Sequence, residues 1–137
     1  MRYLIDTNLF INLVEDKFIS DDVSYILDYE PEKYISSESI KEFIHLVQHD
    51  KVETLIGKRA KKLDVFDFIE NTLNIGVKYV TKEHLNTLAM LELVEGHNDP
   101  SDRLIIAQAI SENLTLISSD RKFPKYRQQG LDFIPNY

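Results

Sequence analysis

Four acidic residues of the sequence fall where strands would end or helices would begin. Asp6 and Asp120 each follow a short apolar run, Glu42 lies on an early turn of an amphipathic helix, and Asp102 opens another helix. No single lysine or arginine occupies a matching position beside each acid to neutralise it. Carboxylates held close together cannot all stay ionised without compensation, for which Mg²⁺ or Mn²⁺ is well suited. The pattern predicts a divalent-cation site.

Each acid also has an ordinary structural explanation, and these alternatives stay open at this point. Asp6 could cap the helix that follows it. Glu42 ends a Ser-x-x-Glu pattern that matches a capping box, and Asp120 could be a turn residue. Asp99 precedes a proline and is a good N-cap, which places Asp102 in the first turn of the same helix. The functional interpretation therefore depends on the joint placement of the acids.

The elements that must position these acids alternate between strands and helices. Short apolar runs predict strands at residues 3–5, 33–36, 77–80, 114–118 and 131–134. Spacing and caps predict helices at residues 9–14, 22–29, 39–49 and 99–113. Two more helices are predicted from their apolar positions: one carries positions 63, 66, 69 and 73, and the other follows position 81 and carries positions 85, 88, 89 and 93. We expect an α/β fold with a mainly parallel, about five-stranded sheet covered on both faces. Ligands bind beyond the carboxyl ends of such strands, so the acids belong to one edge.

Composition restricts the class of protein. The chain has 137 residues, 43% of them hydrophobic and 28% charged, which is typical of a single globular domain spanning residues 1–137. It has no cysteine, which excludes disulfides and cysteine nucleophiles. An acid precedes any possible signal-peptide apolar region and no run nears membrane-spanning length, so we expect a cytoplasmic protein. The net charge of −7 disfavours non-specific nucleic-acid binding, although bound cations reverse the sign of a carboxylate site.

The motifs together resemble a PIN domain, the nuclease fold of VapC-type toxins from bacterial toxin–antitoxin pairs. Residues 3–8, Tyr-Leu-Ile-Asp-Thr-Asn, resemble the first motif, and residues 35–43, Ile-Ser-Ser-Glu-Ser-Ile-Lys-Glu-Phe, resemble the second. Residues 97–109 are close to a subgroup with the pattern Asp-Pro-Phe-Asp-Arg, although Ser101 replaces the phenylalanine. Residues 116–120, Leu-Ile-Ser-Ser-Asp, resemble the last strand and its acid, with Ser118 where threonine is frequent.

The resemblance implies a three-layer α/β/α sandwich and a Mg²⁺-dependent (or Mn²⁺-dependent) endoribonuclease, the toxin of its pair. It implies that the catalytic residues and metal ligands are Asp6, Glu42, Asp102 and Asp120, with Asp6 and Asp102 as the main anchors. It also implies an RNA substrate, a homodimer, and a cognate antitoxin whose tail inserts a basic residue into the acidic site.

Other side chains could support this site. Thr7, Asn8 and Ser118 are candidates for holding Asp6 or a water molecule in place, and Asp99 is a helix cap that could also approach the metal. Candidates for contacts with RNA phosphates are the basic residues Arg103, Lys122, Lys125 and Arg127. The basic run at residues 58–62 either steers RNA or begins a solvated helix.

Other functions fit the sequence less well. His45 and His49 are four residues apart on one helix, as in some zinc sites, but the pattern supplies no third ligand. A phosphatase with an aspartate nucleophile would carry a second aspartate two residues after Asp6, where Asn8 stands. The alternative that remains is a catalytically silent PIN-fold module that captures RNA or a protein partner.

Overall fold

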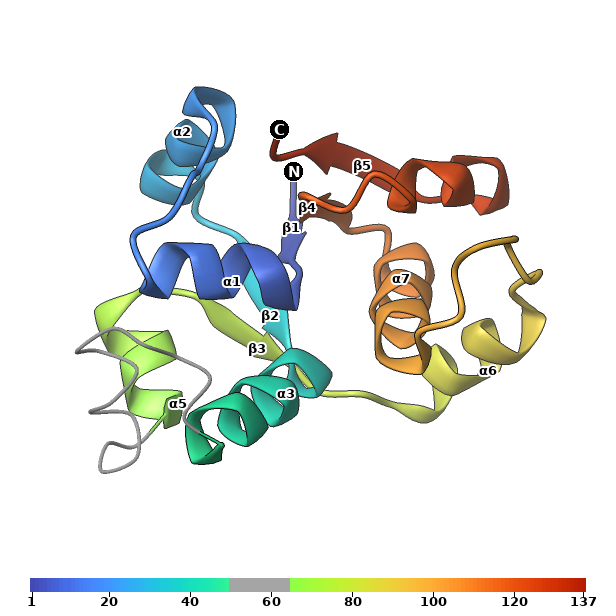
Figure 1. Ribbon diagram of the computed structural model, residues 1–137, viewed down its shortest axis with the longest axis horizontal. Helices are drawn as coiled ribbons and strands as arrows, with labels where there is room; N and C mark the ends of the chain where they lie inside the picture. Colours follow the sequence, from blue (N-terminus) through green and yellow to red (C-terminus); the bar gives the residue numbers. More distant parts are fainter. Residues whose placement is uncertain (50–64) are drawn as a thin grey trace.

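A computed structural model describes residues 1–49 and 65–137. Its strands form one parallel sheet in the order β3-β2-β1-β4-β5 (Figure 1). The strands are β1 (Tyr3–Ile5), β2 (Lys33–Ser36), β3 (Gly76–Lys78), β4 (Thr115–Ser118) and β5 (Asp132–Pro135). The predicted α/β class and parallel sheet are confirmed, with strand ends shifted by at most two residues.

The central strand β1 is buried on both faces of the sheet, which explains its uninterrupted apolar sequence. Ile5 pairs with Ile35 of β2 on one side and with Ile117 of β4 on the other. The chain builds the sheet outward from β1 through β2 and β3, and then continues on the opposite side with β4 and β5. The strand order therefore reverses at β1, and in open α/β sheets ligands bind beyond the carboxyl ends of the strands at such a reversal.

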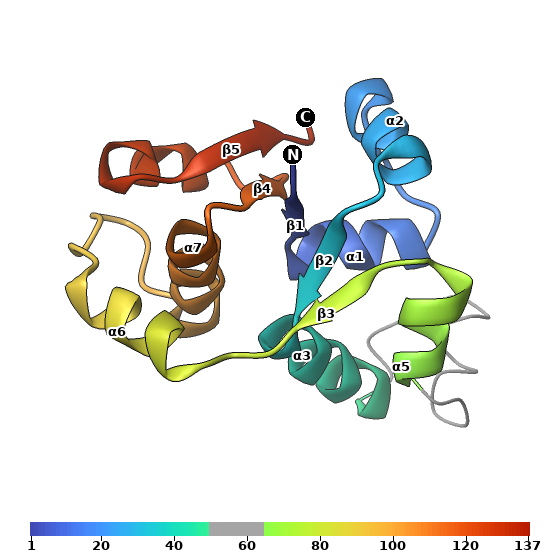
Figure 2. The ribbon, with the colours of Figure 1, turned by 180° about the vertical axis from the view of Figure 1, so that it is seen from behind.

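Helices cover both faces of the sheet (Figures 1 and 2). They are α1 (Thr7–Val14), α2 (Asp21–Tyr29), α3 (Ser37–Gln48), α5 (Val65–Asp67), the π-helical turn η1 (Phe68–Thr72), α6 (Lys82–Met90), α7 (Pro100–Glu112) and the 3-10 helix η2 (Phe123–Gln129). In both views α1 and α7 lie on opposite sides of β1. Within the described residues, none of the helices has the length and apolar character that crossing a bilayer requires.

Alternate residues of β1 enter two separate hydrophobic cores. Tyr3 and Ile5 join the core made with α1, α2, α3 and η1, whereas Leu4 joins the core made with α7, η2 and β5. In the first core, Phe10 and Phe43 meet edge to face with ring centroids 4.9 Å apart. The two-residue alternation of a strand thus splits the interior into two layers on either side of the sheet.

Some sequence-based expectations about the helices are wrong. The predicted long helix around residues 66–73 is a short α-helix followed by a π-helical turn, and position 63 and the basic run at 58–62 lie outside the described residues. Helix α6 ends before Leu93, which is 80% exposed, and its Leu85 is 51% exposed. His84 is the buried residue of α6 because Thr81 N–H donates to its Nδ1 at 3.0 Å and its Nε2 lies 2.7 Å from Glu112 Oε2.

Candidate functional site

Asp6 lies directly after β1, at the carboxyl edge of the sheet where the strand order reverses. Its carboxylate accepts the backbone N–H of Leu9 at 2.8 Å, so Asp6 is the N-cap of α1 as its alternative interpretation predicted. The other oxygen of the carboxylate accepts the Ser118 hydroxyl at 2.5 Å, across from the end of β4. With 2% exposure, the side chain is more deeply buried than a cap requires. Capping therefore does not account for the whole environment of Asp6.

Glu42 lies on α3 and faces Thr7 of α1. The capping-box explanation of Glu42 is wrong, because α3 begins at Ser37 directly after β2 and Ser36 is its N-cap. Glu42 is instead in the second turn of the helix, with Oε1 at 2.9 Å from the Thr7 hydroxyl. That hydroxyl is also 2.9 Å from Ser39 Oγ. Since it has one hydrogen, it can donate to the carboxylate only while it accepts from Ser39.

Asp102 and Asp120 approach Asp6 from α7 and from the loop after β4. Asp99 caps α7 by accepting the Asp102 N–H at 3.1 Å, as predicted, and this leaves the Asp102 carboxylate on the first turn. Asp120 is held by its own backbone N–H, which donates to Ser118 Oγ at 3.0 Å. The Asp120 carboxylate accepts the Lys122 N–H at 2.8 Å, so the predicted turn geometry is present as well.

His97 is a site residue that sequence reasoning overlooked. Its Nε2 is 3.5 Å from Asp102 Oδ2, and one ligand atom each from His97, Asp102 and Asp120 lies within 4.8 Å of the others. Its Nδ1 is 2.7 Å from the Tyr126 hydroxyl. The available signal was a histidine two residues before Asp99, ahead of the acidic helix start. The rings of His45 and His49 lie 4.1 Å apart and are tilted by 35°, and no third ligand joins them in the described residues.

The acids of the site carry negative charge that no basic side chain of the described residues neutralises. Burial is the main cause that raises the pKa of Asp6 to about 7; the hydrogen bonds from Ser118 and Leu9 act against it, and the charges of Asp102 and Asp120 add to it. Burial, followed by Asp99 and Asp120, raises the pKa of Asp102 to about 6. Burial and neighbouring acids, led by Asp102, also raise the pKa of Glu42. In residues 1–49 and 65–137, no lysine or arginine forms an ion pair with any of the four acids.

His97 and several polar side chains surround the four acids. Burial lowers the pKa of His97, which favours its neutral form. Of the predicted supporting side chains, Thr7 contacts Glu42 and Ser118 contacts Asp6, whereas Asn8 is exposed. Glu38 was not predicted; it accepts the Ser101 hydroxyl at 2.7 Å and pairs with Lys41 at 2.9 Å. Ser101, where the subgroup has phenylalanine, thus ties α7 to α3.

The basic candidates for phosphate contact are not gathered in one place. Arg103 donates to the Leu91 carbonyl at 3.3 Å, and Arg127 donates to the Phe133 carbonyl at 3.2 Å. Lys125 lines a separate hollow described below. Lys122 is exposed and follows Asp120 by two residues. Of these candidates, Lys122 therefore lies best for contact with a phosphate at the acids.

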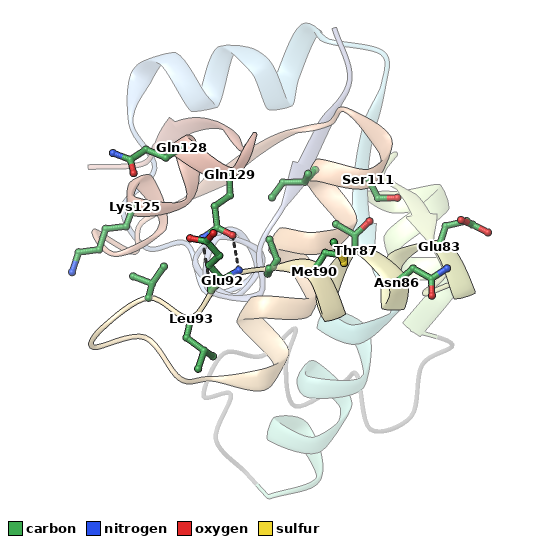
Figure 3. A pocket seen from close by; sticks show the side chains of 13 residues that line it. Glu83, Asn86, Thr87, Met90, Glu92, Leu93, Ser111, Lys125, Gln128 and Gln129 are labelled. Atoms are coloured by element: carbon green, nitrogen blue, oxygen red, sulfur yellow. Dashed lines mark hydrogen bonds between the residues drawn. The ribbon is translucent and has the colours of Figure 1, made fainter.

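A hollow of about 890 Å³ lies between α6, α7 and η2 (Figure 3). Met90, Leu93, Lys125 and Gln129 are among the residues that line it, and Gln129 bonds the backbone of Glu92 at 2.8 and 3.3 Å. A smaller hollow of about 280 Å³ is lined by Glu42 with Lys41, His45 and Leu46. None of the four acids lines the larger hollow, so the acidic site is distinct from it.

Comparisons with known proteins give one family and a consistent fold. The PIN domain family model matches residues 3–129. One similar solved structure is VapBC2 from Rickettsia felis bound to a DNA fragment from its promoter, with 20% sequence identity, 98% of each chain covered and a TM-score of 0.73. Another is VapBC from Salmonella typhimurium bound to DNA, with 17% identity, 100% of this chain and 99% of that chain covered, and a TM-score of 0.73. A toxin–antitoxin complex from Klebsiella pneumoniae is also similar, with 17% identity, 98% of each chain covered and a TM-score of 0.63. No curated protein matches the sequence.

Proposed function

The chain belongs to the PIN domain family, and from this premise we propose that it is a Mg²⁺-dependent (or Mn²⁺-dependent) endoribonuclease acting as the toxin of a toxin–antitoxin pair. The observation that carries the proposal is the convergence of Asp6, Glu42, Asp102 and Asp120 at the carboxyl edge of the sheet beside β1, where no basic side chain of the described residues pairs with them. Raised carboxyl pKa values at a cleft are a mark of functional sites. The fold alone would not identify an activity, but this site favours one.

The residues present fit a divalent cation. The donors are carboxylate oxygens, which Mg²⁺ and Mn²⁺ prefer, and the buried Nε2 of His97 faces them without a hydrogen-bond partner among the described residues. Asp6, Asp102 and Asp120 would hold the cation, with Glu42 beside them. When bound, the cation supplies Lewis-acid chemistry, because it offsets charge on the phosphate and makes an attacking water more acidic.

The chain's own groups account for the remaining steps of phosphodiester hydrolysis. Water attacks phosphorus and gives up one proton, one P–O bond breaks, and the departing oxygen takes one proton from solvent water. Glu42 is partly exposed, and the Thr7 hydroxyl engages only its Oε1, which leaves Oε2 to orient the water or accept its proton. Ser118 fixes the orientation of the Asp6 carboxylate. The Lys122 ammonium is suited to binding a neighbouring phosphate.

An RNA cleavage assay with defined RNAs tests the proposal. The purified chain should cut RNA with Mg²⁺ or Mn²⁺ and should stop when EDTA is added. Asp6→Asn and Asp102→Asn should each lose roughly 100-fold or more in rate, because each removes a charge that holds the cation. Asp28→Asn is the matched control, since Asp28 is an exposed aspartate on α2. Full activity in Asp6→Asn or Asp102→Asn would refute the site assignment, and RNA binding without cleavage would favour a silent binding module.

The partner proposal extends the same site. The similar solved structures are toxin–antitoxin assemblies, and we infer a cognate antitoxin that places a basic side chain among these acids. Exposed aromatic side chains at Phe18, Tyr25 and Tyr29 offer a surface of the kind that protein partners cover. We further infer a homodimer acting in the cytoplasm. Co-expression with the product of a short neighbouring gene should yield a complex with suppressed cleavage, and size-exclusion chromatography with light scattering should give twice the chain mass.

A further inference from the structure

His97 occupies an unusual position for a polar side chain. It lies just before α7 and is 4% exposed, yet its Nε2 has no hydrogen-bond partner among the described residues. That nitrogen faces the carboxylates of Asp102 and Asp120. A buried polar atom without a partner is costly, and in a native protein it calls for an explanation such as a bound ion. The acids around it identify that ion as a cation.

The distances favour shared coordination over a direct hydrogen bond. His97 Nε2 and Asp102 Oδ2 are 3.5 Å apart and form no hydrogen bond. Two ligands of one octahedral cation lie about 3 Å apart when adjacent and about 4 Å apart when opposite, given metal–ligand distances of about 2.1 Å. The observed separation of 3.5 Å is longer than the spacing of adjacent ligands and shorter than that of opposite ones. The imidazole and the carboxylate are therefore close enough to become adjacent ligands of one ion after a shift of about half an ångström.

The other ring nitrogen is held in the way that metal-binding histidines require. Nδ1 lies 2.7 Å from the Tyr126 hydroxyl, which is fully buried in the second core. If Nδ1 carries the hydrogen of the neutral ring, it donates to Tyr126 and leaves the Nε2 lone pair directed at the acids. Metal-bound histidines almost always donate their second N–H in this manner. His97 also packs edge to face against Phe123, with ring centroids 5.6 Å apart, which fixes the ring plane.

We propose that His97 is a nitrogen ligand of the divalent cation and that it makes the site prefer Mn²⁺ over Mg²⁺. The inference rests on the proposed metal site and goes beyond it by adding a ligand and a metal preference. Mg²⁺ favours an all-oxygen octahedron and keeps several waters, whereas imidazole nitrogen suits transition-metal ions. One nitrogen among oxygen ligands therefore shifts the relative affinity toward Mn²⁺. Tyr126 is a positioning residue in this arrangement, because it acts through the imidazole.

The direct test is pulsed electron paramagnetic resonance on the intact chain with one equivalent of Mn²⁺. The wild-type spectrum should show modulation from a coordinated ¹⁴N, and ¹⁵N-histidine labelling should replace it with the ¹⁵N pattern. His97→Gln should abolish the nitrogen signal. His84→Gln is the matched control, since His84 is equally buried but is bonded to Thr81 and Glu112. A triple His45→Gln/His49→Gln/His84→Gln variant retains His97 alone of the four histidines and should keep the signal.

Binding measurements supply a second readout. Mn²⁺ affinity from the free-ion signal should fall about 10-fold or more in His97→Gln, while Mg²⁺ affinity from competition should change much less. Tyr126→Phe should keep the nitrogen signal but lower Mn²⁺ affinity by about 10-fold. Absence of Mn²⁺ binding, absence of nitrogen coupling in the wild type, or coupling that persists in folded His97→Gln would overturn the proposal. If nitrogen coupling is present but RNA is not cut, the ligand assignment stands and the ribonuclease proposal fails.

Discussion

Replacing Asp6 with asparagine should make the metal-free protein more stable at neutral and alkaline pH. The reason is the environment of Asp6, which is buried and close to two other acids. The amide is nearly isosteric with the carboxyl group, so it keeps the acceptor for the Leu9 N–H and can donate to Ser118 Oγ. It carries no charge, and the unfavourable burial of a carboxylate is therefore removed. The change replaces a functional group by a neutral one of the same shape.

The magnitude follows from the pKa of Asp6, which rises from 3.8 to about 7 on folding. Between these values the unfolded chain has lost the proton and the folded protein retains it, so the stability of the wild type falls as pH rises through this window. Three pKa units correspond to about 4 kcal/mol. Loss of the acceptor for the Ser118 hydroxyl offsets about 1 kcal/mol of the gain. Asp6→Asn should therefore be more stable than the wild type by roughly 2–4 kcal/mol at pH 8, and it should be equal or slightly less stable at pH 4.

Urea unfolding followed by circular dichroism, with EDTA present, measures this difference. The wild type, Asp6→Asn and the surface control Asp28→Asn are compared at pH 4, 6 and 8, where the advantage of Asp6→Asn should grow with pH. Adding Mn²⁺ should restore stability to the wild type but not to Asp6→Asn, because the variant lacks the ligand. An Asp6→Asn protein that is no more stable than the wild type at pH 8 would show that the reasoning about buried charge is wrong.

Three further predictions follow from contacts around the site and the sheet. Thr7→Val removes the hydroxyl that lowers the pKa of Glu42, so the rising limb of the pH–rate profile for RNA cleavage should move to higher pH. Thr7→Ser should restore the wild-type profile, and an unchanged profile in Thr7→Val would contradict the role of Thr7. Mn²⁺ at 100 times its dissociation constant should raise the unfolding temperature of the wild type by roughly 10 °C, and an equal shift in Asp102→Asn would argue against that ligand. Gly76→Ala places a Cβ 2.8 Å from the Tyr34 ring and should lower the free energy of unfolding in urea by about 1–3 kcal/mol. Tyr34→Leu in the same chain should recover part of this loss, and additive effects of the two substitutions would argue against a steric cause.

The sheet could be predicted from the sequence because its signals are local. The central strand β1 is a short apolar run that ends at the cap residue Asp6, and the Asp99-Pro100 start of α7 is visible in the sequence. The left-handed Asn113 that ends α7 is equally local, since asparagine tolerates this conformation better than most residues. The orientation of α6 was less predictable. Its buried side is chosen by the His84–Glu112 contact between two helices, which the hydrophobic pattern of α6 does not contain.

The candidate site was predictable in its acids and less so in the residues around them. The four acids stand at recognisable positions, but the Ser-x-x-Glu pattern at Glu42 misleads because α3 starts directly from β2 without a loop. The contact from Thr7 to Glu42 spans 35 residues and depends on how α1 packs on α3. His97 was overlooked for the same reason, because its hydroxyl partner Tyr126 is 29 residues away. Tertiary packing, not local sequence, assembles the support of the site.

The hydrogen bond between Ser118 and Asp6 has a consequence for how the protein is made. It joins residues 112 positions apart, and it forms only when β4 has paired with β1 in the register that sets Ile117 beside Ile5. A slip of one residue would turn the side chains of β4 to the opposite faces of the sheet. On the proposed function, a chain still emerging from the ribosome is harmless to RNA until β4 and Asp120 have been synthesised. The pairing of β1 with β4 therefore comes late in translation, and on the proposed function the chain gains activity only after this pairing.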